Sequence, residues 1–278
     1  MSASSVSADL LYFVPPADGS RPFNNINADL KTGKRARNWE PAEHTVEIED
    51  IRGKESEYTL DTAGFQYYRS ATKHTAFAND DDIKREYYPE SIQLLKELTG
   101  ASKVVLFDHT VRRHRPGDHD TDETKRQPVS QVHVDQTPAS ATARVHRHLP
   151  ADEAKELVKK RFQIINLWRP ITHPAIDYPL ALCDYRSVDE AKDLVPVALI
   201  YPDREGETMG VKFNPNHKWK YQKEMRQDEV VLIKCYDSVH DNNVAVFTPH
   251  TGFKDKTAPK DAPLRESIEL RALVFYDD

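Results

Sequence analysis

The stretch Arg161-Phe-Gln-Ile-Ile-Asn-Leu-Trp-Arg169-Pro170 has the composition of a β-strand, because aromatic and β-branched residues dominate it and a proline ends it. Side chains alternate between the two faces of a strand, which predicts two sets of neighbours. One face carries Phe162, Ile164, Asn166 and Trp168, and the other carries Gln163, Ile165, Leu167 and Arg169. The first face is largely apolar, so a buried Asn166 needs a hydrogen-bond partner there.

Seven further runs of the same kind lie on either side, and turn-forming residues separate most of them. They are Lys103–Arg113, Ser130–Gln136, Val195–Tyr201, Gly210–Phe213, Glu229–Tyr236, Val244–Thr248 and Ser267–Tyr276. Eight strands with little helix between them favour an antiparallel sandwich or barrel over alternating βαβ units. The chain also lacks the glycine-rich motifs of dinucleotide-binding and P-loop folds.

Two helices are expected. Pro89 suits a first helical turn, Ile92, Leu95 and Leu98 form an apolar stripe, and Gly100 suits the end of the helix. The second helix is expected from about Asp152 to Arg161.

The first hundred residues carry only short, broken apolar patches. We expect residues 1–100 to form an irregular N-terminal elaboration that packs on a catalytic core of residues 101–278, within one globular unit.

Composition excludes several classes of protein. The 278 residues carry a net charge of −6, so there is no basic field for nucleic acid or an anionic membrane. The longest apolar runs fall far short of the roughly 18 residues of a membrane span, and the N-terminus lacks the basic start of a secretory signal. Cys183 and Cys235 form no metal-binding pair motif. We therefore expect a cytoplasmic protein that acts on a small molecule, with a homodimer left open.

The sharpest local motif is Gln131-Val-His133-Val-Asp135-Gln136. In a strand, His133 and Asp135 project from the same face, where an imidazole and a carboxylate can bind Fe(II). Such a pair also arises by chance, and a salt-bridged surface histidine is the alternative interpretation.

Two C-terminal features extend the motif. The run Val244-Ala-Val-Phe-Thr-Pro-His250 ends in a histidine that can complete a facial triad of two histidines and one carboxylate. Arg265 and Ser267 then share one face of the last strand, where a guanidinium and a hydroxyl suit the capture of a carboxylate. His240 and His217 remain alternatives to His250 as the third ligand.

With these residues in order, the chain resembles the Fe(II)/2-oxoglutarate-dependent dioxygenases, and more closely the fungal hydroxylase/desaturase family. The motifs that carry the resemblance are Phe107–Arg112, His133–Thr137, Asn166–Pro170, Cys235–Ser238, Pro249–Phe253 and Arg265–Phe275. It covers roughly residues 60 to 278. It implies a mainly β fold with a double-stranded β-helix (jelly-roll, cupin-like) core, a few flanking helices and an N-terminal extension.

The resemblance also implies roles for single residues. His133, Asp135 and His250 would bind the metal, although the separation of 117 positions between the two histidines exceeds the usual spacing. Arg265, helped by Ser267, would hold the distal carboxylate of 2-oxoglutarate.

Other residues are candidates for contact with cosubstrate or substrate. Asn166 would bond to the cosubstrate or to the substrate, and the substrate-binding candidates are Arg169, Trp168, Arg112 and Phe253. No catalytic residue beyond the metal ligands is expected.

Two polar segments are expected on the surface. Arg112–Arg115 is followed by Asp118, Asp120 and Asp122, which indicates a solvated loop or a mobile lid. His146 and His148 are expected to be surface histidines.

The family implies a reaction with Fe(II), 2-oxoglutarate and O2 that oxidises an unactivated C–H bond, by hydroxylation, desaturation or ring formation, in fungal secondary metabolism. Arg, Asn and Tyr residues near the expected site favour a polar, carboxylate-bearing or amino-acid-derived substrate. Two alternatives stay open here. One is a cupin-like metal enzyme that does not use 2-oxoglutarate, and the other is a non-catalytic β-sandwich binding module. A buried Arg265 near the metal residues would argue against the first.

Overall fold

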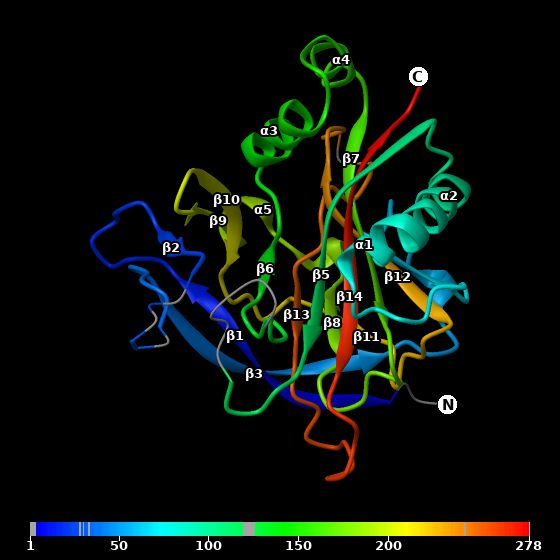
Figure 1. Cartoon of the computed structure of the whole chain (residues 1–278). Helices are drawn as coiled ribbons and strands as arrows, with labels where there is room; N and C mark the ends of the chain where they lie inside the picture. The colour runs from blue at the N-terminus through cyan, green and yellow to red at the C-terminus, as the bar shows by residue number, and fades with distance from the viewer. Residues whose placement is uncertain are drawn as a thin grey trace.

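The computed structural model describes residues 4–27, 29, 31–32, 34–118, 126–241 and 243–277. Its strands form two sheets (Figure 1). The nine-stranded sheet runs in the order β1 (Ser5–Val14), β3 (Glu40–Asp50), β11 (Trp219–Tyr221), β8 (Leu180–Cys183), β13 (His250–Gly252), β6 (His133–Val134), β10 (Glu205–Val211), β9 (Leu194–Ile200), β2 (Phe23–Asn25). The five-stranded sheet runs β4 (Phe65–Arg69), β12 (Glu229–Asp237), β7 (Phe162–Pro170), β14 (Glu266–Phe275), β5 (Lys103–Arg113). The expected mainly β, double-stranded β-helix fold is confirmed.

The main core lies between the two sheets. Phe162, Ile164 and Trp168 of β7 pack there with Leu182 of β8, as their alternation along the strand predicts. Burial of one such side chain stabilises the fold by about 1.5–3 kcal/mol. The opposite face of the five-stranded sheet carries Ile165 and forms a second apolar layer.

The helices flank these sheets. The long helix α2 (Tyr88–Thr99) follows α1 (Asp80–Asp82) and the π-helical turn η2 (Ile83–Tyr87), and it ends at Gly100 with φ 72°, as expected for a left-handed cap. The α4 helix (Ala151–Leu157) forms near its expected position. Shorter helical segments are η1 (Glu55–Glu57), η3 (Tyr185–Ser187) and α5 (Glu190–Asp193).

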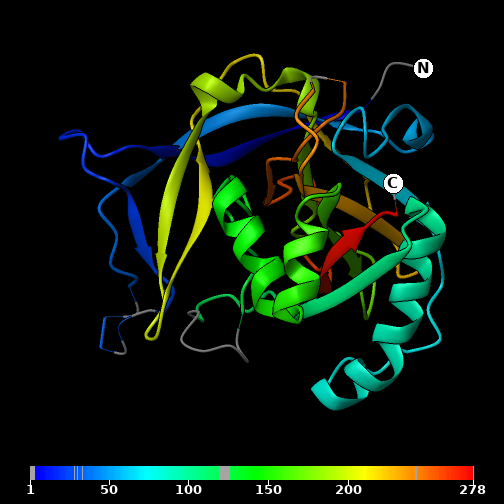
Figure 2. The ribbon, with the colours of Figure 1, turned by 90° about the horizontal axis from the view of Figure 1, so that it is seen from above.

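One helix was not expected. α3 (Pro138–His148) begins with a capping box, in which the Thr137 hydroxyl accepts from the backbone N–H of Ser140 and the Ser140 hydroxyl accepts from the backbone N–H of Thr137. Ala141 and Val145 bury its apolar face. Seen from above, α3 and α4 lie side by side between the β9–β10 hairpin and α2 (Figure 2). The capping signal is present in the sequence, but the polar composition of the segment obscured it.

The prediction of an irregular layer at the N-terminus is wrong. β1 pairs with β3 over ten residues, and β4 belongs to the five-stranded sheet, so this part of the chain contributes to both sheets. The alternating buried residues Val6, Ala8, Leu10 and Tyr12 are the sequence signal for β1. The expected boundary near residue 100 therefore does not separate one sheet from another.

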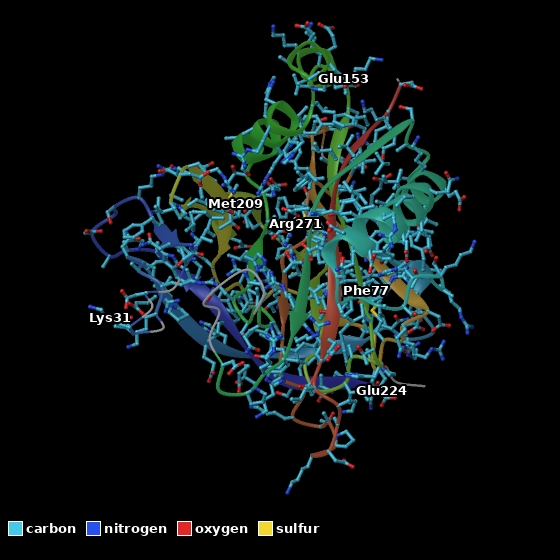
Figure 3. All side chains as sticks on the ribbon, in the orientation of Figure 1. Lys31, Phe77, Glu153, Met209, Glu224 and Arg271 are labelled. Carbon is cyan, nitrogen blue, oxygen red and sulfur yellow. The ribbon has the colours of Figure 1, made fainter. Side chains whose placement is uncertain are left out.

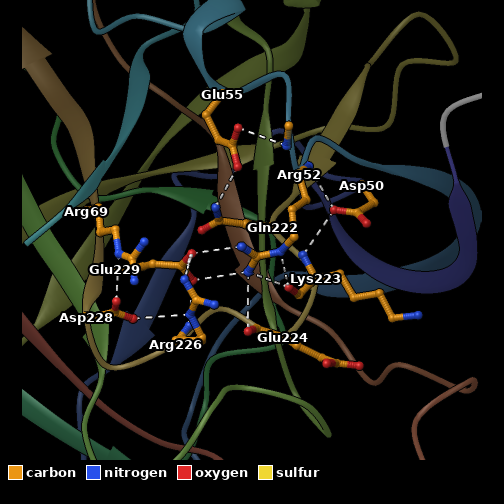
Figure 4. Close-up of polar contacts among 11 residues, drawn as sticks. Asp50, Arg52, Glu55, Arg69, Gln222, Lys223, Glu224, Arg226, Asp228 and Glu229 are labelled. Carbon is orange, nitrogen blue, oxygen red and sulfur yellow. Dashed lines mark hydrogen bonds and ion pairs between the residues drawn. The ribbon is translucent and has the colours of Figure 1, made fainter. Parts of the chain in front are cut away.

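A network of polar contacts joins the segment after β3 to the start of β12 (Figure 4). Arg52 donates to both carboxylate oxygens of Glu229 at 2.8 and 3.1 Å and to the carbonyl oxygen of Lys223. Glu229 also accepts from the backbone of Arg226 at 2.7 Å. These bonds tie the N-terminal strands to the sheet that carries Asn166 and Arg271.

The prediction of a strand over Val244–Thr248 is also wrong. Val244 lies in a bend and residues 245–249 form no strand although they are buried, and the strand β13 starts at His250. The side chains of this segment fill the core, which explains the apolar sequence without a ladder of hydrogen bonds.

Candidate active site

His133 and His250 are direct cross-strand partners, since β6 and β13 pair antiparallel in the middle of the nine-stranded sheet. Asp135 follows β6 by one residue and turns the same way as His133. One ligand atom from each of the three residues lies within 4.8 Å of the others. Among the described residues, the histidine–aspartate motif and the distal histidine thus converge at one point.

Both imidazoles present the same nitrogen to this point. The Nδ1–H of His133 donates to the carbonyl of Gln131 at 2.8 Å, and that of His250 donates to the carbonyl of Thr248 at 3.0 Å. A carbonyl oxygen only accepts, so both protons must lie on Nδ1. Each Nε2 is then free to act as a metal ligand.

Electrostatics favours the ionised form of Asp135 and the neutral form of His250, whereas the hydrogen bond and the charge of Asp135 raise the pKa of His133 despite its burial. Burial opposes the charge on Asp135, but the hydrogen bond with His133 and the charges of Arg271 and His250 keep the pKa of this carboxyl well below its usual range. Burial and the neighbouring His133 lower the pKa of His250, which favours the neutral ligand form. Asp135 Oδ1 lies 3.3 Å from Nε2 of His133 and 4.0 Å from that of His250.

The other carboxylate oxygen of Asp135 contacts the opposite sheet. Asn166 Nδ2 of β7 donates to Oδ2 at 2.7 Å and also donates to Glu269 of β14. Arg271 Nε lies 3.5 Å from the same Oδ2. Two sheets therefore position one carboxylate.

Arg271 lies at the centre of the molecule (Figure 3). It donates to Asp108 and Thr110 of β5 at 3.0 Å each and to Glu269 at 3.2 Å. A β-bulge in the pairing of β5 with β14, next to Arg271, lets Phe107 and Asp108 both face inward. No residue pattern in β5 indicates this bulge, so simple alternation does not predict the inward position of Asp108.

Arg265 and Ser267 form a second polar group on the inner side of β14. Both are buried, at 2 % and 1 % exposure, and Arg265 Nε and Ser267 Oγ have no hydrogen-bond partner among the described residues. Arg265 donates to the carbonyl of Tyr178 at 2.9 Å and lies over the ring of Trp168. Burial and the nearby Arg112 lower the pKa of Arg265 to about 9.

These features fit a carboxylate of 2-oxoglutarate. A buried guanidinium beside another cation gains most from an anion, and the unpaired Ser267 hydroxyl can donate to the same group. Gly252 leaves room there, because a Cβ at this position would lie 3.1 Å from Arg265 Nη1 and from the carbonyl of Val129. The burial of Arg265 argues against a cupin-like enzyme without a carboxylate cosubstrate.

The structure separates the other expected site residues. Trp168 lies on the inner face beside Arg265, and Arg112 pairs across the ladder with Ser267. Arg169 lies on the opposite face, donates to the carbonyls of Ser70 and Gln227, and is placed away from the site. Phe253 is core, packed edge-on against Tyr221.

The competing histidines lie elsewhere. His217 bonds to Asp193 through Nε2 at 3.0 Å, and His240 contacts the ring of Tyr236. His148 is not the surface residue that its sequence context predicts, because it stacks on Phe107 and its Nε2 is buried. Most of the expected lid loop, residues 119–125, lies outside the described residues.

A cavity of about 240 Å³ reaches Asp135 from outside. Helix α3 and the β9–β10 hairpin form its walls, with apolar surface from Ala139, Ala143 and Leu199 and charge from Arg144 and Arg147. This cavity offers a substrate a path to the histidine–aspartate group.

Comparisons with known proteins agree with this site. A family model described as "Oxidoreductase/YMDC permease-like domain" matches residues 10–275. Despite the word permease in this description, the described helices include none that is long and apolar enough to cross a membrane.

Two curated relatives match nearly the whole chain. The hydroxylase/desaturase efuI of Hormonema carpetanum is 39% identical, over 98% of this chain and 96% of its own length. The Fe(II)/2-oxoglutarate-dependent dioxygenase nvfI of Aspergillus novofumigatus is 33% identical, over 95% of each chain.

A solved structure agrees in three dimensions. The iron and alpha-ketoglutarate-dependent endoperoxidase NvfI superposes with a TM-score of 0.87 at 29% identity, covering 99% of both chains. Together with the convergence of His133, Asp135 and His250, these similarities show that the chain belongs to the family of fungal Fe(II)/2-oxoglutarate-dependent dioxygenases that includes hydroxylases and desaturases, and is an oxidoreductase that uses iron, 2-oxoglutarate and O2.

Proposed function

We propose that this dioxygenase oxidises an unactivated C–H bond of a small polar or amino-acid-derived intermediate in fungal secondary metabolism, by hydroxylation, desaturation or ring formation. The convergence of His133, Asp135 and His250 beside a buried, partly unpaired Arg265 carries this proposal. We assign the metal to these three residues and the distal carboxylate of 2-oxoglutarate to Arg265 and Ser267.

Iron and 2-oxoglutarate, when bound, supply the oxidising power of the reaction by coupling decarboxylation of the cosubstrate to O2 reduction. The chain supplies position and a shielded site. The carbonyls of Gln131 and Thr248 hold the Nδ1 protons, so that both histidines offer Nε2. Asn166 and Arg271 hold Oδ2 of Asp135, which leaves Oδ1 turned toward the histidines.

Trp168 and Gly252 shape the cosubstrate end of the site. The ring of Trp168 lies 5.6 Å from the guanidinium carbon of Arg265, which limits the orientations open to that side chain. Asn166 Oδ1 is buried without a partner among the described residues, so it can accept a hydrogen bond from a bound molecule.

The decisive experiment is an anaerobic absorption titration of the metal-free protein with Fe(II) and then 2-oxoglutarate. A weak visible charge-transfer band that requires both additions is the expected result, because it reports chelation of the metal by the cosubstrate. Iron binding without the band would contradict the role of 2-oxoglutarate at this site. No stoichiometric iron binding would contradict the metal centre itself.

Two variants make the titration specific. Asp135→Ala should abolish iron binding and the band together. His217→Ala serves as the control, since its imidazole is also buried but bonds to Asp193 away from the site. Unchanged iron binding in Asp135→Ala would refute the assignment of the ligands.

A further inference from the structure

Three arginines surround the cavity that reaches Asp135. Arg144 and Arg147 lie three residues apart on α3, so they project from one face of the helix toward the β9–β10 hairpin. Arg204 lines the cavity from the turn of that hairpin. The cavity mouth thus gathers cations in a chain whose net charge is −6.

The carboxylates around this cavity already have cationic partners. Glu205 and Glu207 both pair with Arg21, at 2.7 and 3.0 Å, and Glu207 also accepts from Thr137 at 2.7 Å. Arg204 pairs with Asp203 at 3.2 Å and stacks on Tyr201.

Arg144 and Arg147 differ from Arg204 in this respect. Neither has an ion pair or hydrogen bond from its guanidinium within the described part of the chain. Arg144 lies over the ring of Phe107, 5.2 Å from its centre, and His148 stacks on the same ring. Stacking holds the guanidinium in place and leaves its edge donors available to a ligand.

The surrounding pKa values are consistent with excess positive charge. Burial and then Arg144 and Arg204 lower the pKa of Arg147. Burial and then Arg144 and Arg147 lower the pKa of His148. An anion at this place would relieve the repulsion among these groups.

We propose that Arg144 and Arg147 bind a carboxylate of the organic substrate that the enzyme oxidises. The apolar part of this substrate would lie in the cavity, with the reacting carbon toward Asp135. The planar guanidinium matches a carboxylate in two-point hydrogen bonding, and Ala139, Ala143 and Leu199 offer apolar contact. This inference rests on the proposed function, because it takes the metal to lie at Asp135. It goes further in naming an organic acid as the substrate class and the residues that recognise it.

Ligand-observed ¹⁹F NMR tests the proposal with 3-(trifluoromethyl)phenylacetate and its uncharged amide as probes. The protein carries Mn(II), which is paramagnetic and broadens only ligand signals close to the metal, and saturating 2-oxoglutarate occupies the cosubstrate site. Zn(II)-loaded protein is the diamagnetic reference. We expect the ¹⁹F signal of the acid to broaden. The signal of the amide should broaden at least about tenfold less, since the uncharged amide cannot form the charge-assisted pair with the two arginines.

The double variant Arg144→Gln, Arg147→Gln should reduce broadening of the acid about tenfold or more, to the level of the amide. Arg85→Gln is the matched control, because Arg85 is exposed and pairs with Asp82 and Glu86 far along the chain from α3. Equal broadening of acid and amide, or full broadening in the double variant, would overturn the proposal. Broadening of the acid signal that appears only when 2-oxoglutarate is omitted would place the acid at Arg265 and would also overturn the proposal.

Retention of Mn(II), measured beforehand by electron paramagnetic resonance, separates the two claims. Failure to bind the metal would contradict the proposed function. Bound Mn(II) without acid-specific broadening would contradict only the anion site on α3.

Discussion

Asn166 of the five-stranded sheet donates a hydrogen bond of 2.7 Å to Asp135, which directly follows strand β6 of the nine-stranded sheet. The carboxylate of the metal group is therefore oriented by a residue from the other side of the core. Partners of this kind keep ligands in place and support metal affinity.

Replacement of Asn166 by Ala should weaken metal binding about 10- to 100-fold, because Asp135 loses the donor that holds Oδ2. Isothermal titration calorimetry with Co(II) measures the change. Asn216→Ala, in an exposed loop, is the control and should bind the metal normally. Wild-type affinity in Asn166→Ala would show that Asp135 is oriented by its own strand alone.

Replacement of Arg265 by Gln should raise the KM for 2-oxoglutarate about 30-fold or more, since loss of a buried charged partner costs about 2–5 kcal/mol. Metal affinity should stay unchanged, because Arg265 bonds to Tyr178 rather than to the histidines or Asp135. Succinate formation at varied 2-oxoglutarate gives the KM. Ser267→Ala should show a smaller rise in the same direction. An unchanged KM in Arg265→Gln would remove this arginine from the cosubstrate site.

Asp237 lies in a family-like motif, but its contacts indicate a structural role. It accepts hydrogen bonds from Arg161 at 2.7 Å, Gln163 at 2.6 Å and Lys234 at 2.9 Å, and both Asp237 and Lys234 are fully buried. Burial would raise the pKa of Asp237, but the bonds with Arg161 and the charge of Lys234 lower it below its usual value. Its stabilising effect is thus present above the pKa of the unfolded chain, about 3.9, and is lost as the pH falls.

We expect Asp237→Asn to destabilise the protein by about 2–3 kcal/mol at pH 7, because Lys234 and Arg161 lose their buried anion and Lys234 keeps only the more exposed Asp61. The difference from the wild type should shrink as the pH is lowered from 5 to 3. Urea unfolding at several pH values measures both effects. Asp241→Asn, at an exposed loop position, should change the free energy of unfolding by less than about 0.5 kcal/mol. A constant penalty down to pH 3 would contradict the ionised state of Asp237.

Both cysteines should be unreactive in the folded protein. Burial raises the pKa of Cys183 to about 12, and burial with the charges of Asp135 and Glu269 raises that of Cys235 well above its usual value. Since the thiolate is the reactive form, a disulfide reagent should find no thiol at pH 8 and two thiols after denaturation in urea. A fast-reacting thiol in the native state would show that one of the two sites opens to solvent.

The strands that were easiest to predict are those whose residues are buried on one or both faces. β5 spans the expected Lys103–Arg113, and β7 and β14 begin or end within two residues of expectation. β8 and β11 were missed because three or four residues give too little pattern to separate a strand from a buried loop. β6 has only two paired residues, although seven were expected.

The local arrangement of the site residues follows from the amino-acid sequence. Residues two apart in an extended segment share a face, so His133 and Asp135 had to point together, and Arg265 and Ser267 likewise. The alternation in β7 placed Asn166 and Trp168 on the inner side and Arg169 on the other.

The contacts of these residues across the core depend on the tertiary structure. The pairing of His250 with His133, the bond from Asn166 to Asp135, and the bulge that turns Asp108 toward Arg271 all depend on the register between strands far apart in the chain. The position of α3, which brings Arg144 and Arg147 to the cavity, depends on packing against both sheets. Local periodicity gives each residue a face, whereas the contacts across the core follow from the joint packing of all the strands.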